Sequence, residues 1–485
     1  MCAMSEADEK DAPGTWSYAS ARGRWVIAAS VLGSGIAALD ATVVGIALPR
    51  IGKDFHTGVD ALQWVVSAYT MTLAAFLLIG GTLGDRFGRR RVFSVGVAWF
   101  AIASALCGLA PDIHTLIAAR ALQGIGGALL TPGSLAILQA TFTPDDRAKA
   151  IGAWSGLGGL ATAAGPLVGG YLLAIASWRW VFLINLPIAA AVLTVTARHV
   201  PESRGFENSG TLDVAGAASG VLWLSSLTYG LVEAPALGWA DPRVVAAFSI
   251  AAISLAAFVG AEARAVDPML PGGIFADRQF SATNAVTFLL YGALGGVLFL
   301  LPVSLQQVSG YTPLEAGTSL LPLTVIMLLF SPRSGRLATR IGPRLQMSLG
   351  PVVAGLGLAL LVRSTDDHAY LTGVLPAVVV LGAGLATTVS PLTATAMAAA
   401  PAEHVGLASA VNNDVARAAG LIAVGVLPLA TGLTGSAYLE PARFAHGFRV
   451  AMVSCGVLAA VAGLLAAGTI SNDVLGEAQE PAEPA

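Results

Sequence analysis

Long apolar runs alternate with short polar stretches along almost the whole chain. A transmembrane helix needs about 20 apolar residues, and fourteen runs come close to or exceed that length. They cover residues 25–48, 62–83, 92–110, 114–140, 148–173, 178–197, 211–231, 244–262, 281–305, 314–331, 345–363, 370–392, 405–431 and 447–469. The pattern predicts an all-α polytopic membrane protein with 14 transmembrane helices.

Composition supports this prediction and excludes a water-soluble fold. The chain is 55% hydrophobic and 11% charged, whereas soluble domains average about 25% charged residues. The 24 residues before the first run are mostly polar, unlike a secretory signal peptide, so we expect the first span to be retained. Cys2, Cys107 and Cys455 have neither disulfide nor metal-ligand spacing, and we expect no metal site.

Basic residues predict the orientation, because loops rich in Lys and Arg stay in the cytoplasm. The predicted cytoplasmic face holds Arg22, Arg24, Arg86, Arg89, Arg90, Arg91, Arg147, Lys149, Arg198, Arg204, Arg264, Arg278, Arg333, Arg336, Arg340 and Arg344. The other face holds Arg50, Lys53, Arg179, Arg243, Arg363, Arg443 and Arg449. We therefore expect a multi-pass protein of the cell membrane with both termini cytoplasmic.

A glycine-rich basic stretch occurs twice, 254 residues apart. Residues 81–91 read GTLGDRFGRRR and residues 335–344 read GRLATRIGPR, with Gly, Leu, Arg, Gly and Arg at the same offsets. Such a repeat indicates two related halves, as in many transporters. The predicted plan is a cytoplasmic tail over 1–23, a six-helix bundle over 24–198, an inserted two-helix hairpin with linkers over 199–279, a second six-helix bundle over 280–470, and a disordered acidic tail over 471–485.

The first copy of this stretch has the composition of a gate. Gly84 and Gly88 permit a tight turn between two helix ends. Asp85 can form charge-assisted bonds with arginines across the cytoplasmic face, closing one state and breaking in another. We assign the cytoplasmic gate to Gly84, Asp85, Arg86, Gly88, Arg89 and Arg90. The alternative is that the arginines serve only as topology signals.

Two charges lie inside predicted spans. Asp40 lies about 12 Å before the outer end of the first span, and Arg120 about 9 Å after the outer start of the fourth. Each costs about 2.5–3.5 kcal/mol at mid-span, so they should face a cavity or each other. Shifting them by 254 residues gives Leu294 and Val374, so the second half lacks both charges.

We expect Asp40 and Arg120 to carry proton coupling. Burial would favour the protonated carboxyl group and the arginine the ionised one, which leaves Asp40 able to exchange a proton for a substrate. The alternative is a static structural ion pair.

Two further spans carry candidate residues. Glycines and Pro166 in the fifth span allow close helix packing and a bend, or serve only as ordinary packing. In the thirteenth span, Asp414 and Arg417 can neutralise each other or line a polar cavity wall. The antiporter-motif helix comprises Gly156, Gly165, Pro166, Gly169 and Gly170, and the substrate-cavity assignment comprises Gln123, Asn412, Asn413, Asp414 and Arg417. Thr312 and Glu315 have capping-box spacing, which makes Glu315 a helix cap.

The turn at 81–91 resembles the signature loop of the major facilitator superfamily. Residues 39–49, LDATVVGIALP, resemble the first-span motif of its fourteen-span drug/proton antiporter branch, the QacA and EmrB type multidrug exporters, although Gly45 stands where asparagine is usual. Residues 120–128, RALQGIGGA, resemble the fourth-span motif, and residues 156–170 the fifth-span antiporter motif. The resemblance covers nearly the whole chain. It implies the major facilitator fold and export in exchange for protons.

The expected function is proton-driven export of amphipathic drugs, antibiotics or a related secondary metabolite by alternating access. The chain has no GxxxxGK[ST] loop, so we expect the energy to come from an ion gradient or a partner and not from ATP bound by this chain. We expect a secondary transporter and not an enzyme, with protons as the coupling ion and no other cofactor. Its expected partners are the lipid bilayer and a small amphipathic substrate, which can be cationic, but no nucleic acid; the monomer should be functional. The alternatives are a proton-coupled uptake symporter and, more remotely, a membrane-embedded enzyme or sensor.

Overall fold

The computed structural model describes residues 16–204, 214–264, 272–367, 369–400, 405–433 and 440–477. Helices account for every named element in these ranges; one isolated bridge pairs Trp16 with Phe142. The all-helical fold class predicted from the sequence is therefore confirmed. The predicted tails over 1–23 and 471–485 lie largely outside the described residues.

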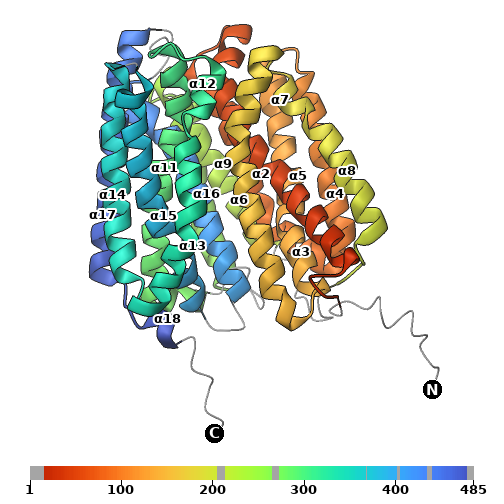
Figure 1. The fold of residues 1–485 in the computed structure, drawn as a ribbon. Helices are drawn as coiled ribbons and strands as arrows, with labels where there is room; N and C mark the ends of the chain where they lie inside the picture. Colours follow the sequence, from red (N-terminus) through yellow and green to blue (C-terminus); the bar gives the residue numbers. More distant parts are fainter. Residues whose placement is uncertain are drawn as a thin grey trace, which may run out of the picture. The chain divides into compact units, whose positions relative to one another are not determined.

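The chain forms two compact units (Figure 1). The first unit comprises the described residues up to Ala47 and Ala68–Ala217. Its helices are most of α2 (Ala21–Phe55), most of α3 (Val59–Phe87), α4 (Arg89–Gly108), α5 (Ile113–Thr141), α6 (Pro144–Ile175), α7 (Trp180–Leu183) and α8 (Asn185–His199).

The second unit comprises Leu48–Ser67 and the described residues from Ala218 onward. It holds the end of α2, the start of α3, the hairpin, and the helices of the second half. These are α9 (Val214–Leu237), α10 (Pro242–Glu262), η1 (Gly272–Ala276), α11 (Arg278–Gln307), α12 (Pro313–Thr318), α13 (Leu321–Ile341), α14 (Arg344–Leu360), η2 (Leu361–Thr365), η3 (Tyr370–Val374), α15 (Leu375–Ala398), α16 (Val405–Ala430), α17 (Pro441–Thr469) and α18 (Val474–Glu477). The hairpin α9–α10 is grouped with the second half.

The two halves repeat one packing pattern. In the first unit α4 packs against α5 and α8, and in the second unit α14 packs against α15 and α17. The turns also correspond, because α3 ends at Phe87 and α13 ends at Ile341, 254 residues later. These helix contacts are thus repeated in the two halves, as expected for a duplicated transporter.

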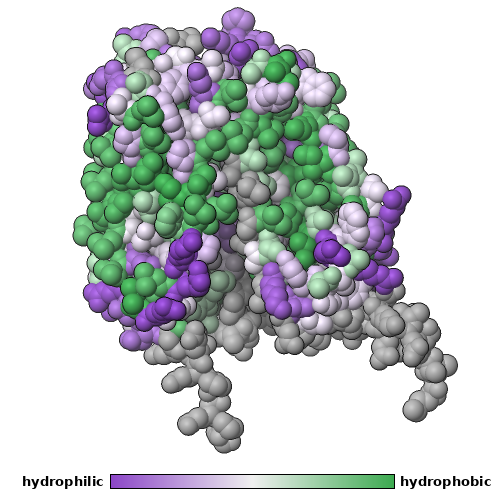
Figure 2. All heavy atoms as spheres, in the orientation of Figure 1, coloured by the Kyte–Doolittle hydropathy of each residue, from purple (hydrophilic) through white to green (hydrophobic). Residues whose placement is uncertain are grey.

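Eleven helices in the described residues are long and apolar enough to cross a membrane, or twelve if the bent α3 counts as one span. Helices α6 and α9 also cover predicted runs but are not in that count. Lipid-facing character is visible on α4, where the exposed residues Val95, Trp99, Ile102 and Leu106 follow one helical face. Figure 2 shows hydrophobic side chains over the middle of α14 and hydrophilic ones toward the C-terminal end of α13.

Candidate functional site

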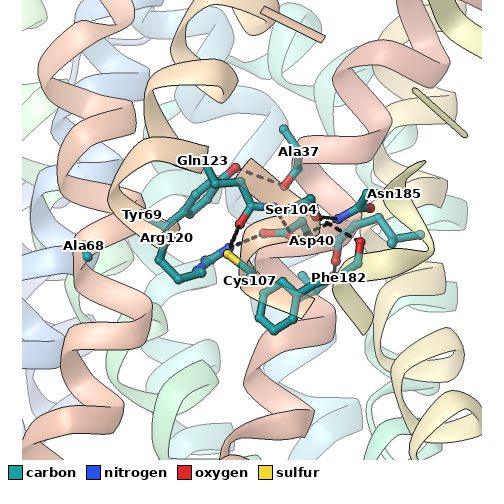
Figure 3. Close-up of polar contacts among 12 residues, drawn as sticks. Ala37, Asp40, Ala68, Tyr69, Ser104, Cys107, Arg120, Gln123, Phe182 and Asn185 are labelled. Atoms are coloured by element: carbon teal, nitrogen blue, oxygen red, sulfur yellow. Dashed lines mark hydrogen bonds and ion pairs between the residues drawn. The ribbon is translucent and has the colours of Figure 1, made fainter. Parts of the chain in front are cut away.

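A buried ion pair joins α2 to α5 within the first unit (Figure 3). The Asp112 side chain caps the start of α5 by accepting a hydrogen bond from the Thr115 backbone N–H at 2.9 Å. Two turns further on, Arg120 Nη1 donates to Asp40 Oδ2 at 2.5 Å. Asp40 is 0% exposed and Arg120 1%. The structure thus brings together the two charges that the sequence placed at a similar depth.

Two amide side chains complete the coordination of the Asp40 carboxylate. Gln123 Nε2 donates to Asp40 Oδ1 at 2.9 Å, and Asn185 Nδ2 donates to the same oxygen at 3.0 Å. Gln123 Oε1 also accepts a 2.6 Å hydrogen bond from Arg120 Nη1. Because each group supports another, the carboxylate, the guanidinium and both amides form one network.

Ser104 anchors this network from α4. Its hydroxyl oxygen accepts hydrogen bonds from Asn185 Nδ2 at 2.9 Å and Gln123 Nε2 at 3.2 Å, while the hydroxyl donates to the Phe182 carbonyl at 2.9 Å. Four elements, α2, α4, α5 and the α7–α8 segment, therefore meet at Asp40. We call Asp40, Ser104, Arg120, Gln123 and Asn185 the Asp40 cluster.

An aromatic ring covers the guanidinium. The Tyr69 ring centroid lies 4.2 Å from Arg120 Cζ, a cation–π distance. Tyr69 is 2% exposed, and its hydroxyl donates to the Ala37 carbonyl at 3.4 Å. The ring helps to stabilise the arginine charge in a site shielded from water.

The two charges of the Asp40 cluster depend on each other. An ion pair in such an environment is stable only while both charges are present, because either charge alone lacks compensation. Adding one proton to Asp40 removes the negative charge that holds Arg120. The Asn185 Oδ1 atom is buried without a hydrogen-bond partner, so the cluster retains one further acceptor beside the carboxylate.

The second half has no ion pair at the corresponding positions. Leu294 lies in α11 and Val374 in η3, where Val374 is 0% exposed. A neutral amide contact joins α11 to α16 in its place: Asn412 Nδ2 donates to Asn284 Oδ1 at 3.1 Å and to Thr287 Oγ1 at 2.8 Å. Polar contacts between helices occur in both halves. At the positions that correspond to Asp40 and Arg120, however, the second half has uncharged residues.

Asp414 and Arg417 in α16 do not form a close ion pair. No contact within 4.0 Å joins the two side chains in the described residues, and Asp414 Oδ1 and Arg417 Nε are both buried without a hydrogen-bond partner. Asn413, one residue before Asp414, is exposed and donates to the Ser409 carbonyl at 2.8 Å. One atom of each charged group in α16 is thus buried without a hydrogen-bond partner.

The first-span and fifth-span motifs contact each other. Gly165 is buried against α2, where an added Cβ would overlap the Thr42 hydroxyl. The Thr42 hydroxyl donates to the Thr162 carbonyl at 3.2 Å, and a Cβ at Gly169 would lie 3.1 Å from Val43 Cγ1. Pro166 lies inside α6, and Gly170 is buried. The surroundings of Gly156 lie outside the described part of the structure.

The predicted gate forms the turn between α3 and α4. Gly88 has a φ of 109°, which favours glycine. Asp85 pairs with Arg89, with 2.7 Å between Oδ1 and Nη2. The linker after α8 closes over this turn, where Glu202 Oε1 accepts a 3.0 Å hydrogen bond from the Arg90 backbone N–H. Gly84 and Arg86 lie in the last turn of α3.

Sequence reasoning missed Tyr69, Ser104, Asn185 and Glu202. Neutral polar residues in apolar runs carry no charge signal, although Asn185 interrupts the apolar stretch VFLINLPIAA at 181–190. Glu202 lies in a linker, where acidic residues are common. The Thr312–Glu315 capping box is confirmed: Thr312 Oγ1 accepts from the Glu315 N–H, and Glu315 Oε2 accepts from the Thr312 N–H. In the described part of the chain no group of three or more His, Cys, Asp or Glu could hold a metal ion.

Comparison with known proteins gives a family match over most of the chain. Residues 30–425 match the model of the family described as Major Facilitator Superfamily. Multidrug resistance protein Stp of Mycobacterium tuberculosis is 36% identical over 414 residues, covering 85% of this chain and 76% of that protein. Puromycin resistance protein pur8 of Streptomyces alboniger is 36% identical over 449 residues, covering 90% and 89%. Tetracenomycin C resistance and export protein of Streptomyces glaucescens is 36% identical over 416 residues, covering 84% and 76%.

Solved structures show the same fold. A bacterial homologue of the human lysosomal transporter Spinster, in an inward-facing and unoccupied conformation, matches with a TM-score of 0.69 and 16% identity, covering 96% of this chain and 100% of that one. A D-xylose-proton symporter matches with a TM-score of 0.64 and 16% identity, covering 93% and 98%. At these identities the likeness concerns the fold alone.

Proposed function

Because the chain belongs to the Major Facilitator Superfamily, we propose that it is a proton-coupled antiporter that exports amphipathic drugs, antibiotics or a related secondary metabolite by alternating access. The protein is a multi-pass membrane transporter and not an enzyme. Export is supported by three relatives whose names describe multidrug resistance, puromycin resistance, and tetracenomycin C resistance and export. The resemblance of the fifth span to the antiporter motif supports the same direction of transport.

The observation that carries the proposal is the buried Asp40 cluster. In the proposed cycle Asp40 accepts one proton, which removes its charge and weakens the bond to Arg120. Arg120 then retains Gln123 Oε1 and the Tyr69 ring as partners. Loss of the proton restores the ion pair. One proton per cycle thus switches the contact between α2 and α5, and substrate movement is coupled to that switch.

The proton gradient supplies enough energy for this task. One charge moving across about 100 mV releases about 2.3 kcal/mol, which supports a substrate gradient of about 40-fold at 1.4 kcal/mol per tenfold. No ATP-binding loop is needed.

The proposed substrate contacts lie in α16. Asp414 Oδ1 is buried without a partner and can accept a hydrogen bond from a cationic substrate. Arg417 Nε, also unpartnered, can bind a polar or anionic group of the same molecule. Asn412, Asn413 and these two charges would form the polar part of an otherwise apolar path.

The test combines drug susceptibility with proton movement. A panel of dyes, quaternary amines and antibiotics first identifies a compound to which expression of the protein confers resistance. Everted vesicles energised to an acidic lumen then report proton release when that compound is added. Substrate-dependent release is expected for the intact protein and for the matched variant Leu294→Ala, but not for Asp40→Asn at equal expression.

Two results would contradict the proposal. Unchanged proton release in Asp40→Asn would place coupling elsewhere. Proton movement together with the compound, and not against it, would identify an uptake symporter.

A further inference from the structure

A cavity of about 410 Å³ lies within the second unit, at the ends of four helices. Its walls come from the last turns of α2, the C-terminal end of α11, the start of α12 and the start of α17. The lining residues are Pro49, Arg50, Gly52, Lys53, Gln306, Gln307, Tyr311, Pro313 and Pro441. The volume falls in the range of about 300 to 1,000 Å³ typical of ligand sites.

The charge of this cavity is positive. Arg50 and Lys53 are three residues apart on the last turns of α2 and therefore lie on one helix face. Both are exposed, and no ion pair or side-chain hydrogen bond of either is found within the described residues. None of the nine lining residues is acidic. A cleft lined by charges of one sign concentrates ions of the opposite sign.

Two carboxylates near the cavity, those of Glu315 and Glu440, bond to other partners. Glu315 caps α12 through the Thr312 N–H and hydroxyl, at 2.8 and 2.9 Å from Oε2. Glu440 pairs with Arg443 at 3.0 Å. Neither carboxylate neutralises the basic pair of α2.

Neutral donors complete the lining. Burial, followed by the nearby Glu315, raises the pKa of Tyr311 above its usual value, so the phenol stays uncharged at neutral pH. Gln307 contributes an amide at the end of α11. At the start of α17, Pro441 occupies the first helical position and no side chain caps the helix, which leaves the positive end of its dipole beside the cavity.

The position of the cavity fits the level of lipid headgroups. All four helix ends belong to one membrane face, and the polar headgroup region begins where the apolar part of each span ends. By the distribution of basic residues this face is the one predicted to lie outside the cytoplasm, where the chain carries few Lys and Arg. Two of these few residues are Arg50 and Lys53.

We propose that this cavity binds an anionic phosphate group, either of a phospholipid headgroup or free in solution. Two cations and neutral donors match the several charged oxygens of a phosphate, which accept charge-assisted hydrogen bonds. Binding at this site is separate from proton coupling at Asp40 and does not depend on the transported substrate.

The experiment measures ligand-induced stabilisation of the purified full chain in a neutral detergent. Three additives are compared, namely phosphatidylglycerol, diacylglycerol with the same acyl chains, and inorganic phosphate. The variant Arg50→Gln/Lys53→Gln removes both cations. The matched control Arg243→Gln/Arg363→Gln removes two basic residues of the same predicted face that do not line the cavity.

A rise in melting temperature with phosphatidylglycerol but not diacylglycerol is expected for the intact chain and the control. The half-saturating concentration should rise about 25-fold in Arg50→Gln/Lys53→Gln, since each basic side chain contributes about fivefold. A matching response to inorganic phosphate identifies the free anion as the ligand, and no response to it identifies the lipid. The exchange variant Arg50→Lys/Lys53→Arg keeps both positive charges and should therefore retain most of the response to phosphatidylglycerol.

The proposal is overturned if Arg50→Gln/Lys53→Gln binds phosphatidylglycerol and phosphate as the intact chain does. It is also overturned if diacylglycerol stabilises the protein as well as phosphatidylglycerol does, or if neither phosphate-bearing additive stabilises it. If Arg50→Gln/Lys53→Gln fails to fold, ligand binding to the intact chain is measured at increasing salt concentration. Binding to two cations must weaken as the salt concentration rises, and unchanged binding overturns the proposal.

Discussion

The turn at Gly88 in the first half and the turn at Gly342 in the second can be compared residue by residue, because they lie 254 residues apart. Both glycines have positive φ, 109° and 82° respectively. Each turn separates two helices of its half, α3 from α4 and α13 from α14. The backbone requirement for glycine has therefore been kept in both copies.

In each turn, an arginine bonds to the segment that follows the last helix of the same half. The Arg90 N–H donates to Glu202 Oε1 at 3.0 Å, and the Arg344 N–H donates to Asn472 Oδ1 at 3.2 Å. Both guanidinium groups also donate to a backbone carbonyl near the C-terminus of the sixth helix of the half, at 3.2 Å for Arg90 and 2.9 Å for Arg344 Nε. The hydrogen-bond geometry is thus repeated in the two units.

Charge distinguishes the two turns. Asp85, which pairs with Arg89 at 2.7 Å, corresponds to Thr339, whose hydroxyl donates to a backbone carbonyl of its own helix. Glu202 corresponds to the neutral Asn472. The second turn keeps the hydrogen bonds without the carboxylates, so carboxylates are not required by the shape of the turn. The same difference in charge is found at Asp40 and Arg120, whose corresponding positions in α11 and η3 are apolar.

The largest expected effect comes from the ion pair itself. Replacing Arg120 with Gln leaves Asp40 buried without its cation, which should lower the free energy of unfolding by about 3–5 kcal/mol. Asp40→Asn/Arg120→Gln should recover most of that stability, because both charges are gone, but no proton release in vesicles. Thermal unfolding and proton release are measured on the same preparations. Recovery of transport together with stability would show that the pair is only structural.

The next effect is shared by the two halves. Gly88→Ala and Gly342→Ala each force a side chain into a backbone conformation that costs about 1–3 kcal/mol. The added Cβ would also meet Glu202 in one turn and Asn472 in the other. Thermal unfolding should show a similar loss of stability for the two variants. The control Gly84→Ala places a Cβ no closer than 4.0 Å to its neighbours and should lose no stability; a loss confined to one turn would contradict the equivalence.

A smaller effect separates the ionic turn from the neutral one. Glu202 Oε2 lies 3.8 Å from Arg90 Nε and 3.7 Å from Arg91 Nε. Glu202→Gln keeps an accepting oxygen but removes the charge, so stability should fall by under about 1 kcal/mol at low salt and show no change at high salt. Asn472→Asp should have the opposite sign, because it gives Arg344 an anionic partner. The melting temperature is recorded at both salt concentrations, and equal changes at the two would exclude an electrostatic origin.

The smallest effect concerns a contact that only the first half can make. Asp146 accepts hydrogen bonds from Lys149, the Tyr18 backbone N–H and the Ser17 hydroxyl, which lower its pKa from 3.8 to about 2. The corresponding residue in the second half is Ala400. The contact is present above pH 4 and should be lost as pH falls toward 2, because the folded-state pKa is depressed.

Asp146→Asn should reproduce this loss at neutral pH. Hydrogen–deuterium exchange should become faster in the peptide that contains Tyr18, while a peptide from the middle of α4 stays unchanged. Unaltered exchange at Tyr18 would mean that the Asp146 carboxylate does not hold this segment.

Much of the fold follows from the sequence, because hydrophobic length and repeat spacing are local properties. The apolar runs coincide with helices, and the 254-residue repeat identifies the matching turns. The predicted hairpin corresponds to α9 and α10, but the sequence does not indicate which helices they contact. Sequence spacing does not reveal such packing, since it depends on contacts such as Leu231 with Gly425, where an added Cβ would lie 3.1 Å from the leucine Cβ.

The candidate site was predictable only in its charged part. Asp40 and Arg120 are conspicuous because charges are costly inside a membrane. Asn185 and Ser104 are not, since neutral polar residues are tolerated in many spans. Gln123 was assigned to the substrate cavity, and the sequence did not indicate that its side chain, 0% exposed, donates to Asp40. Partner choice depends on helix rotation, which a linear pattern does not contain.

The contact between Arg90 and Glu202 has a consequence for the ancestry of the chain. All of the partners that secure this turn come before residue 205, and those that secure the turn at Gly342 come from the same half as well. In each half, the final segment therefore holds an early turn in place. A duplicated gene segment that encodes one half therefore also encodes the residues that hold its turn. Helices inserted after Arg204 do not disturb the contacts that hold the first turn. The hairpin therefore lies at a junction where the chain could be lengthened with little loss of stability.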